Sequence, residues 1–133
     1  IKASEVIASK LGLGKGEPVV YLYRRRFADN EPIVLQKTYL SCKKCGFILD
    51  CDFTKDSLYK SLARTNQTKV VRVQRIVEVD EATNEDAENL EIAMGKPIQS
   101  FTTTGFNVFG EVIEFSLARY RGDRSRFEVS ANI

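Results

Sequence analysis

The stretch from residue 19 to residue 39, VVYLYRRRFADNEPIVLQKTY, decides the fold that we predict for this chain. Apolar and polar residues alternate along it with the period of two that is typical of a β-strand, and the run ADNEP in its middle is typical of a turn. The stretch therefore predicts a β-hairpin. One face of its first strand carries Val20, Leu22, Arg24 and Arg26, and the other carries Val19, Tyr21, Tyr23, Arg25 and Phe27.

Arg24 and Arg26 continue a stripe that begins with apolar side chains. A guanidinium group is costly to bury unless an anionic or polar partner meets it. The first hypothesis is therefore a binding site for a small anion on this face. The alternative is that both arginines pair with surface carboxylates near the end of the strand, as exposed arginines often do.

The register of the hairpin depends on the length of its turn. Pro32 cannot donate a backbone hydrogen bond, so we expect pairing to resume after it, beyond a loop of several residues. A two-residue turn at Asp29-Asn30 would instead place Gln36 on the other face. We predict the longer loop. The expected pairs are Phe27 with Ile33, Arg26 with Val34 and Arg24 with Gln36.

Composition is typical of a single globular domain: 133 residues, 43% hydrophobic and 29% charged. The net charge of +2 is too small to indicate a nucleic-acid-binding surface. No apolar run is long enough to span a membrane, no signal peptide is visible, and the chain opens at Ile1 as a fragment would. Histidine is absent, so an enzyme would have to use carboxylates, cysteines, tyrosines or cations.

Three cysteines, Cys42, Cys45 and Cys51, lie in one short stretch. An odd number without a secretory signal favours reduced thiols in a cytoplasmic protein. Cys42 and Cys45 have the spacing of half a zinc knuckle or of a redox pair, but a four-ligand site would have to recruit Cys51 and a carboxylate as well. We therefore expect neither a metal nor a cofactor.

The rest of the chain alternates between helices and strands. Helices are expected at 3–11, at 55–64 behind an N-cap at Thr54, and at 84–94 behind an N-cap at Thr83. Strands are expected at 69–79, 98–108, 112–120 and 127–129. This order predicts an α+β domain, in which an antiparallel sheet is flanked by helices.

Two further groups of polar residues support the anion site. Ser57 lies near the start of the second helix, where free backbone N–H groups attract anions; its alternative role is to cap that helix. Glu114, Ser116, Ala118 and Tyr120 share one face of the strand at 112–120 and would form a small, polar floor. Glu114 could accept hydrogen bonds from a ligand, or it could be exposed or paired with an arginine.

Four segments resemble the UTRA domain, the effector-sensing half of HutC-type GntR transcription regulators. They are ASEVIASKLGLGKGEPVVYLYRRRFADNEPIVLQKTYL (3–40), DSLYKSL (56–62), NEDAENLEIAMGKPIQSF (84–101) and EVIEFSLARYRGDRSRFEV (111–129). The first and last segments are the diagnostic ones. The resemblance covers essentially the whole chain, and it implies a chorismate-lyase-like fold with a ligand cleft on the sheet.

The resemblance also implies roles for individual residues. The family's phosphate-binding arginines correspond to Arg24 and Arg26, and its Gly-Ser-Leu-Tyr helix start corresponds to residues 56–59, which include Ser57 and Tyr59 but carry aspartate in place of the glycine. Gln36 stands where the family has a glutamate. The candidate effector-binding residues are Arg24, Arg26, Gln36, Ser57, Tyr59, Glu114, Ser116 and Tyr120.

A sensor, and not an enzyme, is what the resemblance implies. Family members bind small metabolites such as sugar phosphates, amino sugars, fatty acids and histidine-pathway compounds, usually as homodimers. Their UTRA domain follows a winged helix-turn-helix domain that binds operator DNA, which is absent from residues 1–133. We therefore expect an anionic metabolite as effector, contact with DNA only through the missing domain, a cytoplasmic location and no membrane association. The alternative is a chorismate-lyase-like enzyme acting on a small organic acid.

Overall fold

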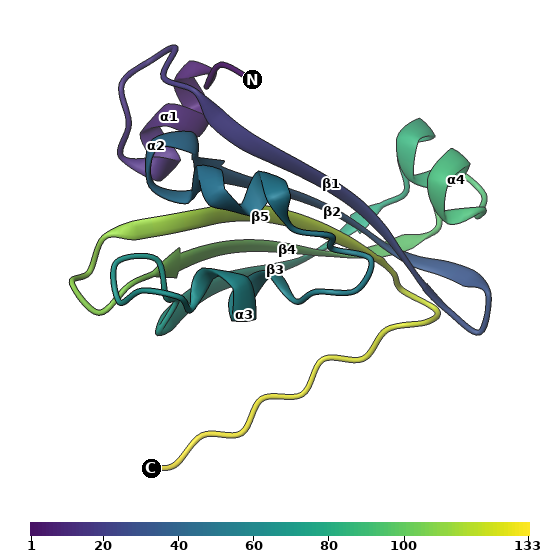
Figure 1. The fold of residues 1–133 in the computed structure, drawn as a ribbon. Coiled ribbons are helices and arrows are strands. Elements are labelled where there is room, and N and C mark those ends of the chain that lie inside the picture. Colours follow the sequence, from purple (N-terminus) through teal and green to yellow (C-terminus); the bar gives the residue numbers. More distant parts are fainter.

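The computed structural model describes residues 1–133 and contains a five-stranded antiparallel sheet with helices on both faces (Figure 1). The strand order is β1-β2-β5-β4-β3, so β5 is central. The strands are β1 (Val19–Ala28), β2 (Glu31–Ser41), β3 (Arg72–Glu81), β4 (Pro97–Phe106) and β5 (Val112–Arg121). The helical elements are α1 (Glu5–Leu11), α2 (Cys42–Cys45), the 3-10 helix η1 (Gly46–Asp50), α3 (Leu58–Leu62) and α4 (Asn84–Leu90). The predicted α+β class is confirmed.

The β1–β2 hairpin has the predicted register but a different turn. Asp29-Asn30 is a two-residue turn whose φ angles, 50° and 64°, lie in the left-handed region that Asp and Asn tolerate. The longer loop that we predicted was therefore wrong. A β-bulge between Arg26 and Phe27 shifts the ladder by one residue and so offsets the effect of the short turn. As a result, Arg24 lies opposite Gln36, as predicted.

The bulge also changes the pairs next to the turn. Phe27 lies opposite Pro32, where we predicted Ile33, whereas Arg26 lies opposite Val34 as predicted. β2 begins at Glu31, so pairing resumes before Pro32 and not after it. A proline is compatible with this position because the regular ladder is already interrupted by the neighbouring bulge.

Side chains alternate between two faces of the sheet, which we call front and back. On the front face, Val20 and Leu40 pack with residues of α2, η1 and α3 in one buried cluster. On the back face, α1 packs on Val19 and Phe115. Farther along the same face, α4 packs on Leu35 and its strand neighbours. The helices of the front face cover only part of it, and the uncovered part is where the candidate site lies.

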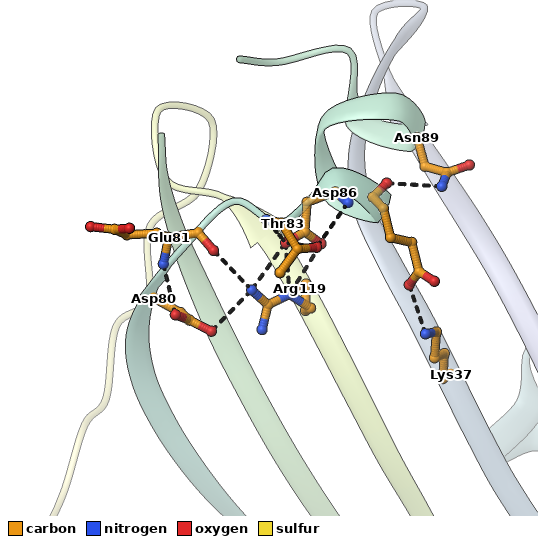
Figure 2. A network of polar contacts seen from close by, with 8 residues as sticks. Lys37, Asp80, Glu81, Thr83, Asp86, Asn89 and Arg119 are labelled. Carbon is orange, nitrogen blue, oxygen red and sulfur yellow. Dashed lines mark hydrogen bonds and ion pairs between the residues drawn. The ribbon is translucent and has the colours of Figure 1, made fainter. Parts of the chain in front are cut away.

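Arg119 of β5 connects α4 to the back face through a network of charges (Figure 2). Its Nε lies 3.0 Å from both carboxylate oxygens of Asp86, which is completely buried, and its Nη2 lies 3.1 Å from Oδ2 of Asp80. Asp86 also accepts a hydrogen bond from the backbone N–H of Thr83 and completes a capping box at the start of α4. Charge is therefore matched by opposite charge in this part of the core.

All three predicted helices differ from the prediction; α1 begins at Glu5 and not at residue 3, and the other two differ more. The helix predicted at 55–64 begins only after Ser57, because the Thr54 backbone and hydroxyl donate to Asp52 in a local turn and do not cap a helix. Thr83 does cap α4 as predicted, but the helix ends at Leu90, because the next residue, Glu91, adopts the left-handed conformation. Both helices are therefore shorter than expected.

The strand predicted at 127–129 does not form. This segment pairs with no strand, and Phe127 instead packs against the ring of Phe101 on β4, with the ring centroids 5.1 Å apart. Aromatic packing onto the front face thus replaces the backbone pairing that we expected.

No helix is both long enough and apolar enough to cross a membrane. The three cysteines are free, and burial raises the pKa of the Cys45 thiol to about 11. No group of three or more His, Cys, Asp or Glu side chains is arranged to hold a metal ion.

Candidate functional site

A cavity of about 400 Å³ opens on the front face, beside α3. All eight of the candidate residues line it: Arg24, Arg26, Gln36, Ser57, Tyr59, Glu114, Ser116 and Tyr120. They come from β1, β2, β5 and the start of α3, which are far apart in the sequence. The structure therefore brings together the residues that the sequence analysis singled out.

The antiparallel register explains this convergence. Residues directly opposite each other on neighbouring strands lie on the same face, so one row of side chains crosses the sheet from Arg24 through Gln36 and Ala118 to Phe101. The next row toward the turn contains Arg26 and its neighbours on β2 and β5. Small residues such as Ala118 leave the space that the cavity occupies.

Glu114 is the buried carboxylate of the site, with an exposed fraction of 2%. Its Oε1 accepts a hydrogen bond from the Tyr59 hydroxyl, and its Oε2 accepts one from Ser116 Oγ at 2.9 Å. Burial, together with this carboxylate, raises the pKa of Tyr59, so the phenol keeps its proton. Gly105 makes room for the arrangement, since a Cβ there would lie 2.8 Å from Glu114 Cγ. Glu114 is therefore neither exposed nor joined to an arginine by an ion pair.

Arg24 and Gln36 are the unsatisfied members of the site. Arg24 Nε, a donor, and Gln36 Oε1, an acceptor, are both buried without a hydrogen-bond partner. Burial and the neighbouring charge of Arg26 lower the pKa of Arg24. A buried donor without a partner costs roughly 1–3 kcal/mol, so this pair is expensive for the folded chain. The alternative in which Arg24 pairs with a surface carboxylate does not occur.

Ser57 is the N-cap residue of α3, but its side chain makes no capping hydrogen bond. Ser57 lines the cavity, next to Asp56. With five residues, α3 is too short to supply much of a helix dipole, so the serine hydroxyl and the arginines are the groups that this end of the cavity offers to an anion.

A model of the UTRA domain family matches residues 1–126. The chain belongs to the UTRA domain family. Among curated proteins, the HTH-type transcriptional regulator GmuR of Bacillus subtilis (strain 168) is 30% identical to it over 121 residues. The match covers 91% of this chain but only 51% of GmuR, so this UTRA domain spans about half the length of that relative.

Solved structures of similar fold come from the same class of regulators. A GntR-family transcriptional regulator from Enterococcus faecalis V583 superposes with a TM-score of 0.89 and 25% identity, covering 98% of this chain and 94% of that one. The effector domain of PhnF from Mycobacterium smegmatis gives a TM-score of 0.91 at 22% identity, covering 100% and 82%, and its likeness concerns the fold alone. These relatives are regulators, and they give no support to the enzyme alternative.

The sequence analysis missed several residues that line the cavity of this UTRA domain, among them two arginines and one phenylalanine. Arg75 of β3 donates from Nε to Thr103 Oγ1 at 3.3 Å, and Arg126 and Phe127 approach from the C-terminal segment. Arg75 interrupts a stripe that begins with valines, which is the signal that identified Arg24, so the pattern could have found it. Arg126 and Phe127 could not be placed because no periodicity describes their segment.

Proposed function

We propose that this chain is the effector-binding domain of a GntR-family transcription regulator of the HutC subfamily, and that its effector is a small anionic metabolite bound in the front cavity. The observation that carries the proposal is the buried Arg24 Nε without a partner, opposite the equally unpartnered Gln36 Oε1. A ligand with an anionic oxygen and a hydroxyl or N–H donor would satisfy both groups.

The charge of the cavity supports an anion. Four guanidinium groups line it, those of Arg24, Arg26, Arg75 and Arg126, against the two carboxylates of Asp56 and Glu114. Guanidinium groups bind phosphate and carboxylate through paired hydrogen bonds, which are stronger than bonds between neutral groups. The positive excess in a partly enclosed site therefore favours a phosphate or carboxylate over a neutral compound.

The remaining lining supports a ligand that also carries hydroxyl groups. Gln99, Thr103 and Ser116 add short polar side chains, and Phe101 and Tyr120 add aromatic rings whose centroids lie 5.1 Å apart. A sugar ring presents both hydroxyl groups and apolar faces, and it fits a cavity of about 400 Å³. We therefore propose a sugar phosphate as the first class of effector to test.

In the regulator, effector binding would act on a winged helix-turn-helix domain outside this chain, in a cytoplasmic homodimer. The effector can change DNA binding only by binding one arrangement of the two domains better than the other. Contact with operator DNA would then belong to the attached domain, and this domain would supply the sensor and a dimer contact.

A thermal-shift screen tests the proposal. The chain is heated with sugar phosphates, amino sugars, organic acids and fatty acids, and a selective rise in melting temperature that grows with ligand concentration is expected for an anionic member. Arg24→Ala should abolish the rise. Arg25→Ala is the matched control, because it removes the same charge one residue away on the back face. The proposal would be contradicted if the ligand raised the melting temperatures of Arg24→Ala and Arg25→Ala equally, or if the chain turned the ligand over.

A further inference from the structure

The chain turns a sharp corner where β5 ends. The backbone N–H of Gly122 donates to the carbonyl oxygen of Pro97 at 2.9 Å, and a Cβ on Gly122 would lie 2.7 Å from that oxygen, so this close approach requires a glycine. Two residues on, Arg124 Nε lies 3.0 Å from Oε2 of Glu31. Because Pro97 belongs to β4 and Glu31 to β2, the corner is attached to two strands of the sheet.

Residues 125–128, which we call the strap, follow this corner and run back on the side of the sheet where α3 lies (Figure 1). Ser125 Oγ donates to Gln99 Oε1 at 3.0 Å, and the ring of Phe127 meets that of Phe101 edge-on, with the centroids 5.1 Å apart. All four of these side chains line the cavity. The strap takes part in no backbone hydrogen bond, so these side-chain contacts are what hold it on the front face.

The strap and the unpartnered arginine belong to opposite ends of the cavity. Arg24 is on β1, whereas the strap rests on Gln99 and Phe101 of β4, and β2 and β5 lie between these two strands. Neighbouring strands are about 4.8 Å apart, so the backbones of β1 and β4 are separated by roughly 14 Å. A ligand whose anionic group is bound by Arg24 therefore reaches the strap only if it extends well beyond that group.

The strap keeps binding surface that the chain itself does not use. Phe127 remains 43% exposed although its ring packs on Phe101, and Phe101 in turn contacts the ring of Tyr120, with centroids 5.1 Å apart. Arg126 lies 3.4 Å from Glu128 in an ion pair whose side chains are both largely exposed, and such pairs contribute little to stability. The strap can therefore move at low cost, and its ring and its guanidinium group are both available to a ligand.

We propose that the strap closes over the part of the effector that extends beyond its anionic group, and that Phe127 is a specificity-determining residue whose ring packs on an apolar face of that part, such as the face of a sugar ring. The inference rests on the proposed function and adds to it which end of the cavity recognises which end of the effector. Arg126 exchanges Glu128 for a ligand oxygen as the strap closes. Closure also excludes water, which strengthens the interaction between Arg24 and the anion.

Calorimetric titration with two probes of different length tests the inference. Inorganic phosphate is too small to reach the strap, whereas glucose 6-phosphate extends toward it and should bind the parent chain more tightly. Phe127→Ala should weaken the binding of glucose 6-phosphate about 2- to 10-fold, as expected for the loss of an aromatic contact, and should leave the binding of inorganic phosphate unchanged. Phe127→Tyr keeps the ring and should keep the parent affinity for both probes.

Phe109→Ala is the matched control, because it makes the same change at a phenylalanine that is 66% exposed in the turn between β4 and β5, outside the cavity. The inference is overturned if Phe127→Ala binds glucose 6-phosphate as well as Phe109→Ala does, if it weakens both probes by the same factor, or if the parent chain binds the two probes equally. Binding of phosphate that depends on Arg24 but not on Phe127 contradicts only the role of the strap. A parent chain that binds neither probe contradicts the proposed function, and the inference with it.

Discussion

Arg119 and Arg24 are both partly buried arginines of the same sheet, and they differ in what surrounds them. On the back face, Arg119 meets two aspartates, and its Nε bonds both oxygens of the buried Asp86 (Figure 2). On the front face, Arg24 has a buried Nε with no partner. Burial alone would lower the pKa of both arginines. The aspartates raise the pKa of Arg119, whereas the pKa of Arg24 stays lowered.

We propose that this difference separates a structural arginine, Arg119, from a ligand-binding one, Arg24. A buried charge whose partner is supplied by the chain stabilises a particular packing, here that of α4 on the sheet. A buried charge without a partner lowers stability and is retained where a ligand completes it. Arg119 and Arg24 should therefore respond in opposite ways to removal, which gives the predictions below.

The largest effect is expected for Arg119→Ala. This change leaves the carboxylate of Asp86 buried and without its cation, and breaking a buried ion pair in this way costs about 3–5 kcal/mol. Urea denaturation measures the loss as a change in the free energy of unfolding. Lys37→Ala is the control, because it breaks the more exposed pair with Glu85 and should cost about 1 kcal/mol or less. Similar losses in the two variants would contradict the claim that the ion pair between Arg119 and Asp86 stabilises the packing of α4 on the sheet.

A smaller effect is expected for Asp86→Asn, in how the free energy of unfolding depends on pH in acid. Burial would raise the pKa of Asp86, but hydrogen bonds from Arg119 and the Thr83 backbone lower it below its usual value of 3.8. A lowered folded-state pKa contributes stability that is present above 3.8 and is lost as the pH falls through the folded pKa. The free energy of unfolding should therefore fall less steeply below pH 4 in Asp86→Asn than in the parent, by up to about 1.4 kcal/mol per pH unit. Identical slopes would contradict the ion pair.

The smallest effect on stability is expected for Arg24→Met. It replaces a desolvated, unpartnered guanidinium by an apolar chain of similar length, so the ligand-free domain should keep its stability or gain about 0.5–1 kcal/mol. The same variant should lose the thermal shift caused by an anionic effector. A loss of stability as large as that of Arg119→Ala would show that Arg24 has a structural partner and would remove the contrast.

The sequence was sufficient for the site wherever a strand pattern fixed the face of a side chain. Alternation placed Arg24 and Arg26 on one face of their strand, and Glu114 and Ser116 on one face of another. The pairing of Arg24 with Gln36 was predicted correctly although the turn was not. Two local features, a tight turn and a bulge, offset each other in their effect on register, and strand periodicity reports neither. The network of Arg119 was not foreseen, because its partners lie more than 30 residues away along the chain.

The measurement that tests the central claim most directly is NMR of the arginine Nε–H groups during a titration with inorganic phosphate. The Nε–H signal of Arg24 should shift and saturate as a phosphate oxygen accepts a hydrogen bond from this group. The chemical shift of the Arg119 signal should not change, because its Nε–H already donates to Asp86. Signals that move equally without saturation, or an Arg24 signal that does not move while Arg119 does, would contradict the account.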